Sequence, residues 1–511
     1  MPVMRVPLVL TILVMTAFVA AILPSPKANS QDEMSDSAGG GQQPLRLGVL
    51  VPFTGALFTF GPDYLNAAQL AADEINAAGG VNSGQVVIVT GDTGTSAEQG
   101  VTEAQRLVDV EGVVAIMGAA SSRVSLAVAE SVTIPNGILQ ISPASTSPAL
   151  THVEDNDFLF RMPISDAAQG VVLAQLIAED LGLTSVCDLY VNNAYGLGLS
   201  AQFGTSFAEL GGTVTASVSH DDAEAISYIA ELAECTAGDP EALVAISYPT
   251  GQATVYLREA LESGLIDNFV FVDGTKYPEM FNDIGWVHFD GMLGTAPGAL
   301  ESAFGDAFDD AFVAEYGALY GTPFVREAFD AVVAIALGAA AAGTNTDAAA
   351  IRDSLRDTVN APGTVYGPGE GGIAAALAAV AIGEDIDYQG ASGPVEFDEN
   401  GDIRFGAIEV WQVDACSRTL FTIRRVRVDL AAGETETADE FTLPPGIVGD
   451  VNGDGTVNPV DAAFILQLSA GLLGSLPCAE GADVSGDGVT NPPDAALILQ
   501  YAAGLLGSLP P

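Results

Sequence analysis

Positive charge is what this sequence lacks most. Its 511 residues include 16 Lys and Arg against 66 Asp and Glu, which gives a formal net charge of −50. The only lysines are Lys27 and Lys276, and no Lys or Arg follows Arg427. Because binding to nucleic-acid phosphates needs clustered cations, the composition argues against a nucleic-acid partner. The acidity fits solubility in salty or calcium-rich surroundings and defines no activity by itself.

The common signatures of hydrolases and nucleotide-dependent enzymes are also absent. The sequence has no GxSxG elbow, no HExxH and no GxxxxGK phosphate loop. Its three histidines, His152, His220 and His288, are far apart, and no nucleophile–base pair can be identified around them. We therefore predict a protein that is not an enzyme.

The start of the chain has the features of an export signal. Within residues 1–30, Arg5 precedes the apolar run VPLVLTILVMTAFVAAIL, and the small residues at 28–30 offer a cleavage site. The apolar run is long, so an uncleaved N-terminal anchor is the alternative. No cysteine precedes Cys187, which excludes a bacterial lipoprotein anchor. We expect an exported protein, periplasmic, extracellular or on the cell surface, with a polar linker at 31–44.

The four cysteines leave the disulfide pattern open. They are Cys187, Cys235, Cys416 and Cys478, and an exported protein can oxidise them. Cys187 opens a strand-like run and Cys235 ends a helix-like run before the next strand, so these two are candidates to pair. Sequence alone does not fix the connectivity.

Residues 45–427 alternate between strand-like and helix-like segments. LRLGVLVPF, QVVIVTGD, VVAIMG and GILQIS are apolar runs typical of buried strands, and the segments between them have helical periodicity. Strands that alternate with helices predict parallel α/β sheets. A segment of about 380 residues exceeds the size of one compact core, so two lobes are expected.

Small hydroxyl residues follow three of the predicted strands. They lie at Phe53-Thr54-Gly55, at Ala119-Ala120-Ser121-Ser122 and at Pro143-Ala144-Ser145-Thr146. Ligands of open α/β sheets bind where strands end, and free backbone N–H groups there can donate hydrogen bonds to an anion. With no cationic side chain in these loops, a carboxylate fits better than a bulky phosphate.

Several segments of 45–427 resemble the type I periplasmic binding proteins, in particular the branched-chain amino acid (leucine/isoleucine/valine) binding branch. The resemblance rests on the order and spacing of PFTGALFTFGPDYLNAAQLAADEINAAGG, GAASSRVSLAVAE, GILQISPASTSPALT, NNAYGLGLS, SYPTGQATVYLREALESGL, FVDGTKYPEMF and GPVEFDENGDI. It implies two lobes that close on a ligand around a hinge of three crossovers, which we place near Arg161–Asp166, Thr295–Gly298 and Asp402–Phe405.

The same resemblance implies a set of ligand-binding residues. Ser122, the backbone of Ala144 and the hydroxyl of Thr146 would hold an α-carboxylate. Tyr195, Tyr248 and the acid Asp273, which would take the ammonium, would come from the second lobe. Phe60 and Phe324 would contact the ligand side chain. A zwitterion needs hydrogen-bond donors at one end and a carboxylate at the other, which this set supplies.

Structural roles are the alternatives at these positions. Ser122 and Thr146 can be helix N-caps, Tyr195 and Tyr248 ordinary interface residues, and Asp273 a turn residue in DGT. The neighbouring acids at 221–222, after His220, are interpreted as a helix cap.

An acidic loop followed by an apolar helix occurs twice near the end of the chain. DVNGDGTVNPVDAAFILQ begins at Asp450 and DVSGDGVTNPPDAALILQ at Asp483, a repeat of 33 residues. Oxygen-bearing residues recur with the EF-hand calcium spacing, with glycine at the sharp turn. The predicted calcium ligands are Asp450, Asn452, Asp454, Thr456, Asn458 and Asp461 in the first loop, and Asp483, Ser485, Asp487, Val489, Asn491 and Asp494 in the second.

The paired loops, each followed by one helix, resemble the dockerin type I domain. Position 12 is Asp in both loops, where the EF-hand has Glu. Positions 10 and 11, a frequent Ser/Thr pair that contacts a cohesin, are Pro459-Val460 and Pro492-Pro493. The resemblance implies two bound Ca²⁺ ions and a cohesin-like or cell-surface partner, whereas the residues at positions 10 and 11 argue against the usual cohesin contact. The apolar helices are too short to span a membrane, and we expect them to pack on each other.

Together these features predict an α/β type I periplasmic-binding fold followed by a small α calcium-binding module. The expected function is an extracytoplasmic solute-binding protein of an ABC importer that binds a branched-chain amino acid or similar small carboxylate and delivers it to an ABC permease. A ligand-binding sensor component and a dockerin-borne extracellular enzyme are the alternatives. The predicted segments are a signal or anchor (1–30), a linker (31–44), the binding domain (45–427, with lobe 1 about 45–163 and 297–403, lobe 2 about 164–296 and 404–427), a linker (428–448) and the dockerin-like domain (449–511).

Overall fold

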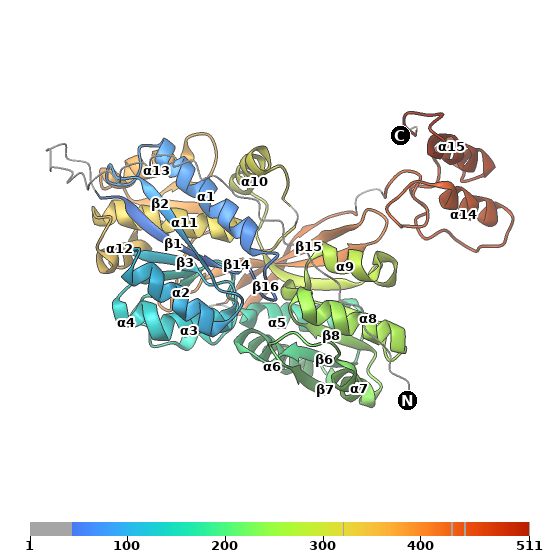
Figure 1. Cartoon of the computed structure of the whole chain (residues 1–511), viewed down its shortest axis with the longest axis horizontal. Coiled ribbons are helices and arrows are strands. Elements are labelled where there is room, and N and C mark those ends of the chain that lie inside the picture. The colour runs from blue at the N-terminus through green and yellow to red at the C-terminus, as the bar shows by residue number, and fades with distance from the viewer. Residues whose placement is uncertain (1–42, 320, 431–432, 444–445, 510–511) are drawn as a thin grey trace, which may run out of the picture. The chain divides into compact units, whose positions relative to one another are not determined.

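A computed structural model describes residues 43–319, 321–430, 433–443 and 446–509 (Figure 1). The predicted signal or anchor and almost all of the first predicted linker lie outside these residues. Within the described residues, no helix has the length and apolar character needed to cross a bilayer.

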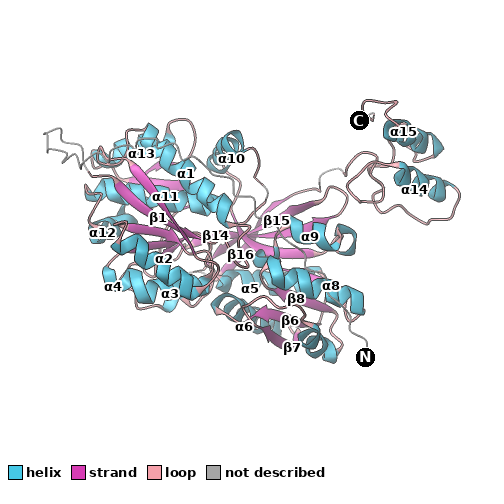
Figure 2. Cartoon of the chain, in the orientation of Figure 1, coloured by secondary structure: helices cyan, strands magenta, loops and turns pink. Residues whose placement is uncertain are grey.

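The first lobe is built on a five-stranded parallel sheet in the order β2-β1-β3-β4-β5. Its first strand is buried almost throughout, because helices cover both faces (Figure 2). This explains why these strands are continuous apolar runs in the sequence. The strands are β1 (Leu45–Val51), β2 (Val86–Asp92), β3 (Ala115–Gly118), β4 (Leu139–Ser142) and β5 (Leu159–Arg161).

The helices of the first lobe come from two separate stretches of chain. α1 packs on α11, whose residues are nearly all buried, and α2 packs with α3 on the opposite face. A small sheet, β11-β12-β13, lies beside them. The helices are α1 (Gly61–Ala77), α2 (Ala97–Asp109), α3 (Ser122–Val128), α4 (Ile134–Asn136), α10 (Ala303–Tyr316), α11 (Val325–Ala342), α12 (Ala348–Val359) and α13 (Gly372–Ala381); the strands are β11 (Thr364–Tyr366), β12 (Ile386–Gly390) and β13 (Gly393–Pro394).

The second lobe contains an eight-stranded mixed sheet in the order β16-β15-β14-β10-β9-β8-β6-β7. Strands β6 to β10 are parallel to one another, and strands β14 to β16 extend the sheet by antiparallel pairing. The elements are β6 (Ser185–Val191), β7 (Thr213–His220), β8 (Ala242–Ile246), β9 (Phe269–Phe271), β10 (Leu293–Gly298), β14 (Phe405–Asp414), β15 (Thr419–Asp429), β16 (Glu434–Glu440), α5 (Asp166–Gln175), α6 (Ala194–Glu209), α7 (Ile229–Cys235), α8 (Thr254–Ser263) and α9 (Pro278–Ile284). The predicted two-lobed α/β fold is thus confirmed.

Strand β16 corrects one expectation. It lies within 428–448, which we expected to be linker, and it pairs along β15 from Asp429 to Arg424. Its sequence, ETETADE, has no apolar face to signal a strand. As the edge strand of the sheet it gains its ladder hydrogen bonds from β15, and its charged side chains protect the open edge.

The chain crosses between the lobes at 162–165, 299–302 and 395–404. The first and third crossings overlap the predicted hinge segments. The second falls after Thr295–Gly298, because those residues belong to β10 in the second lobe. A buried ion pair joins the end of β5, just before the first crossing, to the third crossing: the Arg161 Nη2 atom lies 2.6 Å from the Asp402 Oδ2 atom.

The C-terminal module consists of two loops, each followed by one helix, α14 (Pro459–Ser469) and α15 (Pro492–Ala502). The expected packing of the two helices is confirmed, since equivalent residues of both repeats share one core. That core contains Val451, Ala462, Ile465, Leu476, Ala482, Val484, Ala495 and Ile498.

Two disulfides use all four cysteines. Cys187 pairs with Cys235, as the sequence allowed, and joins β6 to the end of α7. Cys416 pairs with Cys478, which links the β14–β15 turn of the second lobe to the C-terminal module. The backbone N–H of Ile447 also donates to the carbonyl of Cys416 at 3.2 Å. The module is therefore tied covalently to the second lobe.

Candidate functional site

Seven of the eight residues predicted to bind a ligand surround one cavity between the lobes. Its volume is about 30 Å³, and the side chains that enclose it come from both lobes. The lining consists of Phe60, Ser122, Ala144, Tyr195, Tyr248, Asp273 and Phe324, which were predicted, and Leu57, Tyr64, Ala120, Ser121 and Gly274, which were not.

The first lobe contributes small polar groups at the ends of β3 and β4. The Ser142 hydroxyl accepts hydrogen bonds from the backbone N–H groups of Ala144, at 3.3 Å, and Ser145, at 2.9 Å. The Ser122 hydroxyl accepts from the N–H of Ser147 at 3.3 Å. These bonds pin the 144–147 loop against the start of α3. Ser121, Ser122 and Ala144 thereby line the cavity from the first lobe.

The second lobe contributes a buried carboxylate. Asp273 follows β9, is 4% exposed, and accepts hydrogen bonds from the Tyr195 hydroxyl at 2.8 Å and from Gln169 Nε2 at 2.9 Å. Burial raises the pKa of Asp273 above its usual range, and these donors only partly offset that effect. A cationic group in the cavity would favour the charged carboxylate.

A second buried acid, which sequence analysis missed, lies next to Asp273. Asp166 begins α5 immediately after the first crossing and is fully buried. Among the described residues, no hydrogen-bond partner reaches either carboxylate oxygen of Asp166 or Oε1 of Gln169. Burial, and then the charge of Asp273, raise the pKa of Asp166. The segment SDAAQG was a usable signal, because an acid ends a predicted hinge segment there and an amide follows three residues later.

The two predicted tyrosines stack on each other. The rings of Tyr195 and Tyr248 lie 5.7 Å apart at an interplanar angle of 9°. The Tyr248 hydroxyl lies 3.1 Å from the Ser121 hydroxyl of the first lobe, and Asn193 Nδ2 donates to it at 3.1 Å. The Tyr248–Ser121 contact holds the lobes together across the cavity.

An ion pair outside the cavity also connects the lobes and corrects one interpretation. Asp222 does not cap a helix: its Oδ2 atom lies 2.5 Å from Nη1 of Arg123, at the start of α3, and its Oδ1 atom accepts from Asn193. Only the Asp221 carboxylate makes a local turn, through the N–H of Ala223.

Thr146 and the loop after β1 differ from the expectation. Thr146 is buried but does not line the cavity; its carbonyl accepts from Arg161 and from the N–H of Asp166. Phe53-Thr54-Gly55 is no anion seat, because the carboxylate of Asp92 already accepts from the N–H groups of residues 53 and 54.

The two C-terminal loops have the same hydrogen-bond pattern. Asp450 accepts from the N–H groups of Gly453 at 2.9 Å and Gly455 at 2.7 Å, and Asp483 accepts from Gly486 and Gly488 at the same distances. At position 12, Asp461 and Asp494 each bond back into their own loop. Residues 1 and 12 of each loop therefore fold that loop back on itself.

The first loop fits a divalent cation electrostatically. Burial is the main cause that raises the pKa values of Asp450 and Asp461, and the nearby charge of Asp454 raises both further. Such mutual repulsion is relieved by a cation. In the described part of the chain no three His, Cys, Asp or Glu side chains are already placed to hold a metal. The EF-hand set also uses amide, hydroxyl and backbone oxygens, which these loops contain.

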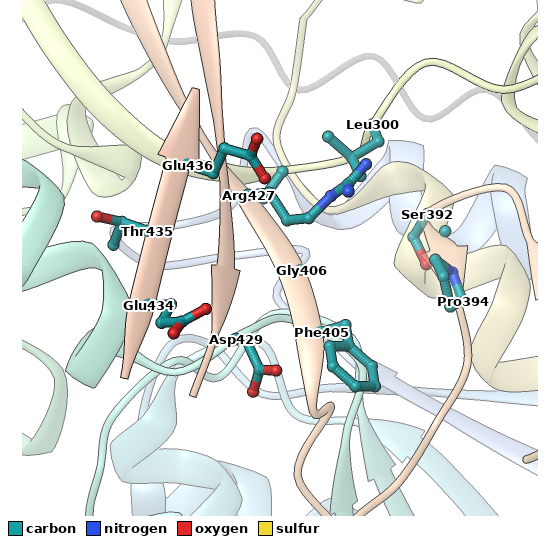
Figure 3. Close-up of a pocket in the computed structure, with 12 residues that line it drawn as sticks. Leu300, Ser392, Pro394, Phe405, Gly406, Arg427, Asp429, Glu434, Thr435 and Glu436 are labelled. Atoms are coloured by element: carbon teal, nitrogen blue, oxygen red, sulfur yellow. The ribbon is translucent and has the colours of Figure 1, made fainter. Parts of the chain in front are cut away.

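A separate groove of about 750 Å³ lies along the edge of the second lobe, away from the predicted site residues (Figure 3). Figure 3 shows Arg427 beside Glu436, with Glu434 below, on strands β15 and β16. Its lining combines Arg427 with the acids Asp429, Glu434 and Glu436, and it includes none of the predicted ligand-binding residues.

Family models match both parts of the chain. Residues 44–376 match the family described as Periplasmic binding protein, and residues 448–503 match the Dockerin type I domain. The chain belongs to the periplasmic binding protein family. It ends in a dockerin type I domain, and such domains are calcium-binding in general.

Two curated relatives of this periplasmic binding protein carry names that refer to amino acid binding. An amino acid binding protein of Pseudomonas aeruginosa is 36% identical over 154 residues, 30% of this chain and 41% of the relative. Leu/Ile/Val-binding protein homolog 2 of Brucella abortus is 29% identical over 246 residues, 47% of this chain and 64% of the relative. The chain thus matches less than two thirds of the length of these curated relatives.

Solved structures support the fold. A leucine binding protein from Thermotoga maritima has a TM-score of 0.61 at 23% identity, covering 77% of this chain and 98% of that one. A branched-chain amino acid transporter substrate binding protein from Streptococcus pneumoniae, in complex with isoleucine, has a TM-score of 0.61 at 22% identity, with 77% and 99% covered. A Rhodopseudomonas palustris solute binding protein in complex with benzoate has a TM-score of 0.59 at 17% identity, with 78% and 99% covered.

Proposed function

We propose that this periplasmic binding protein captures an amino acid, or a similar small carboxylate, outside the cytoplasm and presents it to an ABC permease. The observation that supports this most directly is the convergence of two chemistries from opposite lobes. On one side the Ser122 hydroxyl would donate to a ligand carboxylate, as would the N–H of Ala144 on giving up its 3.3 Å bond to Ser142. On the other side Asp273 offers a buried carboxylate. A zwitterion matches both sides, whereas a ligand without a cationic group would leave the charge of Asp273 without a counter-charge.

Closure of the lobes supplies the selectivity in this proposal. The contacts between Tyr248 and Ser121 and between Arg123 and Asp222 exist only when the lobes meet. A ligand that bridges the lobes adds its own contacts to the closed form and shifts the population toward it. A permease that recognises the closed form would thereby respond to loaded protein.

Calorimetric and thermal unfolding experiments on the full chain test this function. The ligand panel is leucine, isoleucine, valine, benzoate, an uncharged amide and a sugar. We expect an α-amino acid to bind at one site per chain and to stabilise the binding domain by about 2.7 kcal/mol at a concentration of one hundred times Kd. Binding of the sugar alone, or of no compound in the panel, would contradict the proposal.

We also propose that the C-terminal module binds two Ca²⁺ ions and attaches the protein to a cohesin-like or cell-surface partner. Asp450, Asn452, Asp454, Thr456, Asn458 and Asp461 would hold the first ion, and Asp483, Ser485, Asp487, Val489, Asn491 and Asp494 the second. Calcium would neutralise carboxylates that otherwise repel each other, and so would couple binding to folding of the module.

Calcium stoichiometry gives a sharp prediction for this module. Equilibrium dialysis should find two ions per wild-type chain, one in Asp461→Ala, one in Asp494→Ala and none in the double variant, because each residue closes its own loop. At one hundred times Kd, calcium should stabilise the module by about 2.7 kcal/mol per site. Glu480→Gln, an exposed acid in the same module, is the matched control and should keep two. Equal stoichiometry in all variants would refute the assignment.

A further inference from the structure

A second cavity lies directly behind one wall of the ligand site. It has a volume of about 270 Å³ and is formed between the N-terminus of α11 and strands β10, β14 and β15. Phe324 lines both this cavity and the one between the lobes. Phe324 is therefore shared by the linings of a small inner cavity and a larger outer one.

Phe324 is held in an unusual conformation. Its φ angle is +68°, in the left-handed region that bulky residues rarely adopt, and the residue is 6% exposed. It occupies the N-cap position of α11 without a side-chain capping bond. Left-handed backbone at such a residue persists only where its surroundings hold it, and it is concentrated at ligand-contacting sites. A side-chain rotation of Phe324 would join the two cavities without moving a lobe.

The outer cavity concentrates positive charge in a chain that has little. Three of the sixteen Lys and Arg residues, Lys276, Arg326 and Arg425, line it. Lys276 pairs with the buried Glu409, and Arg326 pairs with Asp309 at 2.6 Å. Glu327, the other acid in the lining, is buried, and burial raises its pKa to about 8, so it is mostly protonated at pH 7. The lining is therefore net positive.

Arg425 has unused hydrogen-bonding capacity. Its Nη1 atom lies 3.3 Å from Oε1 of Glu301, an ion pair without hydrogen-bond geometry whose acid is 62% exposed. Its guanidinium stacks on Phe441 at 4.8 Å. In the described residues, no hydrogen-bond partner reaches the buried Nε and Nη1 atoms of Arg425. A guanidinium with free buried donors at the wall of a cavity suits a carboxylate, which can accept two parallel bonds.

We propose that the preferred ligand is an amino acid with a second, distal anionic group, which passes Phe324 and is held in the outer cavity by Arg425. This inference rests on the proposed function, since the α-carboxylate and ammonium still occupy the cavity between the lobes. It adds a specificity determinant for side-chain length and charge. An uncharged side chain of the same length would leave the donors of Arg425 without a partner.

Isothermal titration of the full chain with L-2-aminoadipate and L-norleucine tests the inference. The two side chains have nearly the same length, and only the first ends in a carboxylate. We expect 2-aminoadipate to bind at least about tenfold more tightly, as a charge-assisted hydrogen bond in a buried site implies. The wild-type comparison needs no variant, so it holds even if a substitution prevents folding.

Arg425→Gln should abolish the preference for 2-aminoadipate while norleucine binding stays within about twofold. Arg424→Gln is the matched control, because the neighbouring Arg424 pairs with Asp180 outside the cavity and its loss should keep the preference. Equal affinities of the two amino acids for the wild type, or an unchanged preference in Arg425→Gln, would overturn the distal site and leave the proposed function intact. Absence of binding by any amino acid or carboxylate would overturn both.

Discussion

Asp273→Asn should weaken amino acid binding by about 2–5 kcal/mol, a rise in Kd of roughly thirtyfold or more. The asparagine keeps the size of the side chain and a hydrogen-bond acceptor for Tyr195 and Gln169, but it removes the charge that a ligand ammonium would meet. In a buried site that loss is not compensated by water. Titration calorimetry with leucine, or with the tightest amino acid of the panel, measures the effect.

The control for this variant is Asp267→Asn, an exposed acid just before β9. It should leave Kd unchanged. If Asp273→Asn binds the amino acid as tightly as the wild type, Asp273 is only a turn residue in DGT. Tighter binding of a carboxylate without an amine would keep a solute-binding role and remove the acid from it.

The affinity of the wild type should also depend on pH in one direction. Because burial raises the pKa of Asp273, the carboxyl of the ligand-free protein takes up a proton above the ordinary aspartate range. An ammonium ligand needs the ionised form, so affinity should rise as pH increases through the raised pKa. The stability of the ligand-free protein should change in the opposite direction. The contribution of the Asp273 carboxyl to the free energy of unfolding is full below the unfolded-state pKa and is lost as pH rises through the folded-state pKa. Asp273→Asn should remove the contribution of Asp273 from both profiles, while that of the neighbouring Asp166 remains.

Arg161→Met should lower the free energy of unfolding of the binding domain by about 3–5 kcal/mol. All five N–H donors of this buried guanidinium are used: Asp402 accepts two, the carbonyls of Thr146 and Ser147 accept from Nη1, and the Thr151 hydroxyl accepts one. Methionine fills similar space and leaves the Asp402 charge buried without its partner. Urea unfolding followed by tryptophan fluorescence measures the loss.

A double variant separates charge burial from packing. Arg161→Met/Asp402→Leu removes both charges, and it should recover most of the stability lost in the single variant. Arg404→Met is the matched control in the same crossing, since Arg404 is exposed and lies 3.9 Å from Glu396; it should cost less than about 1 kcal/mol. A loss below 1 kcal/mol in Arg161→Met would show that the pair does not hold the hinge.

The local sequence pattern was sufficient to predict the order of helices and strands and the turns of the two C-terminal loops. The continuous apolar runs of β1, β3 and β4 follow from burial on both faces of a parallel sheet, and the apolar residues that this burial requires can be read directly from the sequence. The two C-terminal loops depend on contacts within twelve residues, so their spacing alone predicts the turn at Gly455 and the closing bond of Asp461.

Long-range geometry decided the remainder. β16 forms because its backbone pairs with the edge of β15, and the sequence ETETADE has no pattern that predicts a strand. The Cys416–Cys478 pairing, the burial of Asp166 beside Asp273 and the ion pair of Asp222 with Arg123 each join segments that are distant in sequence. Chain topology determines which of many possible partners meet, and burial then sets the pKa and bonding of each. The amino-acid order therefore determined the local elements and candidate ligands, whereas only the tertiary structure decided their neighbours.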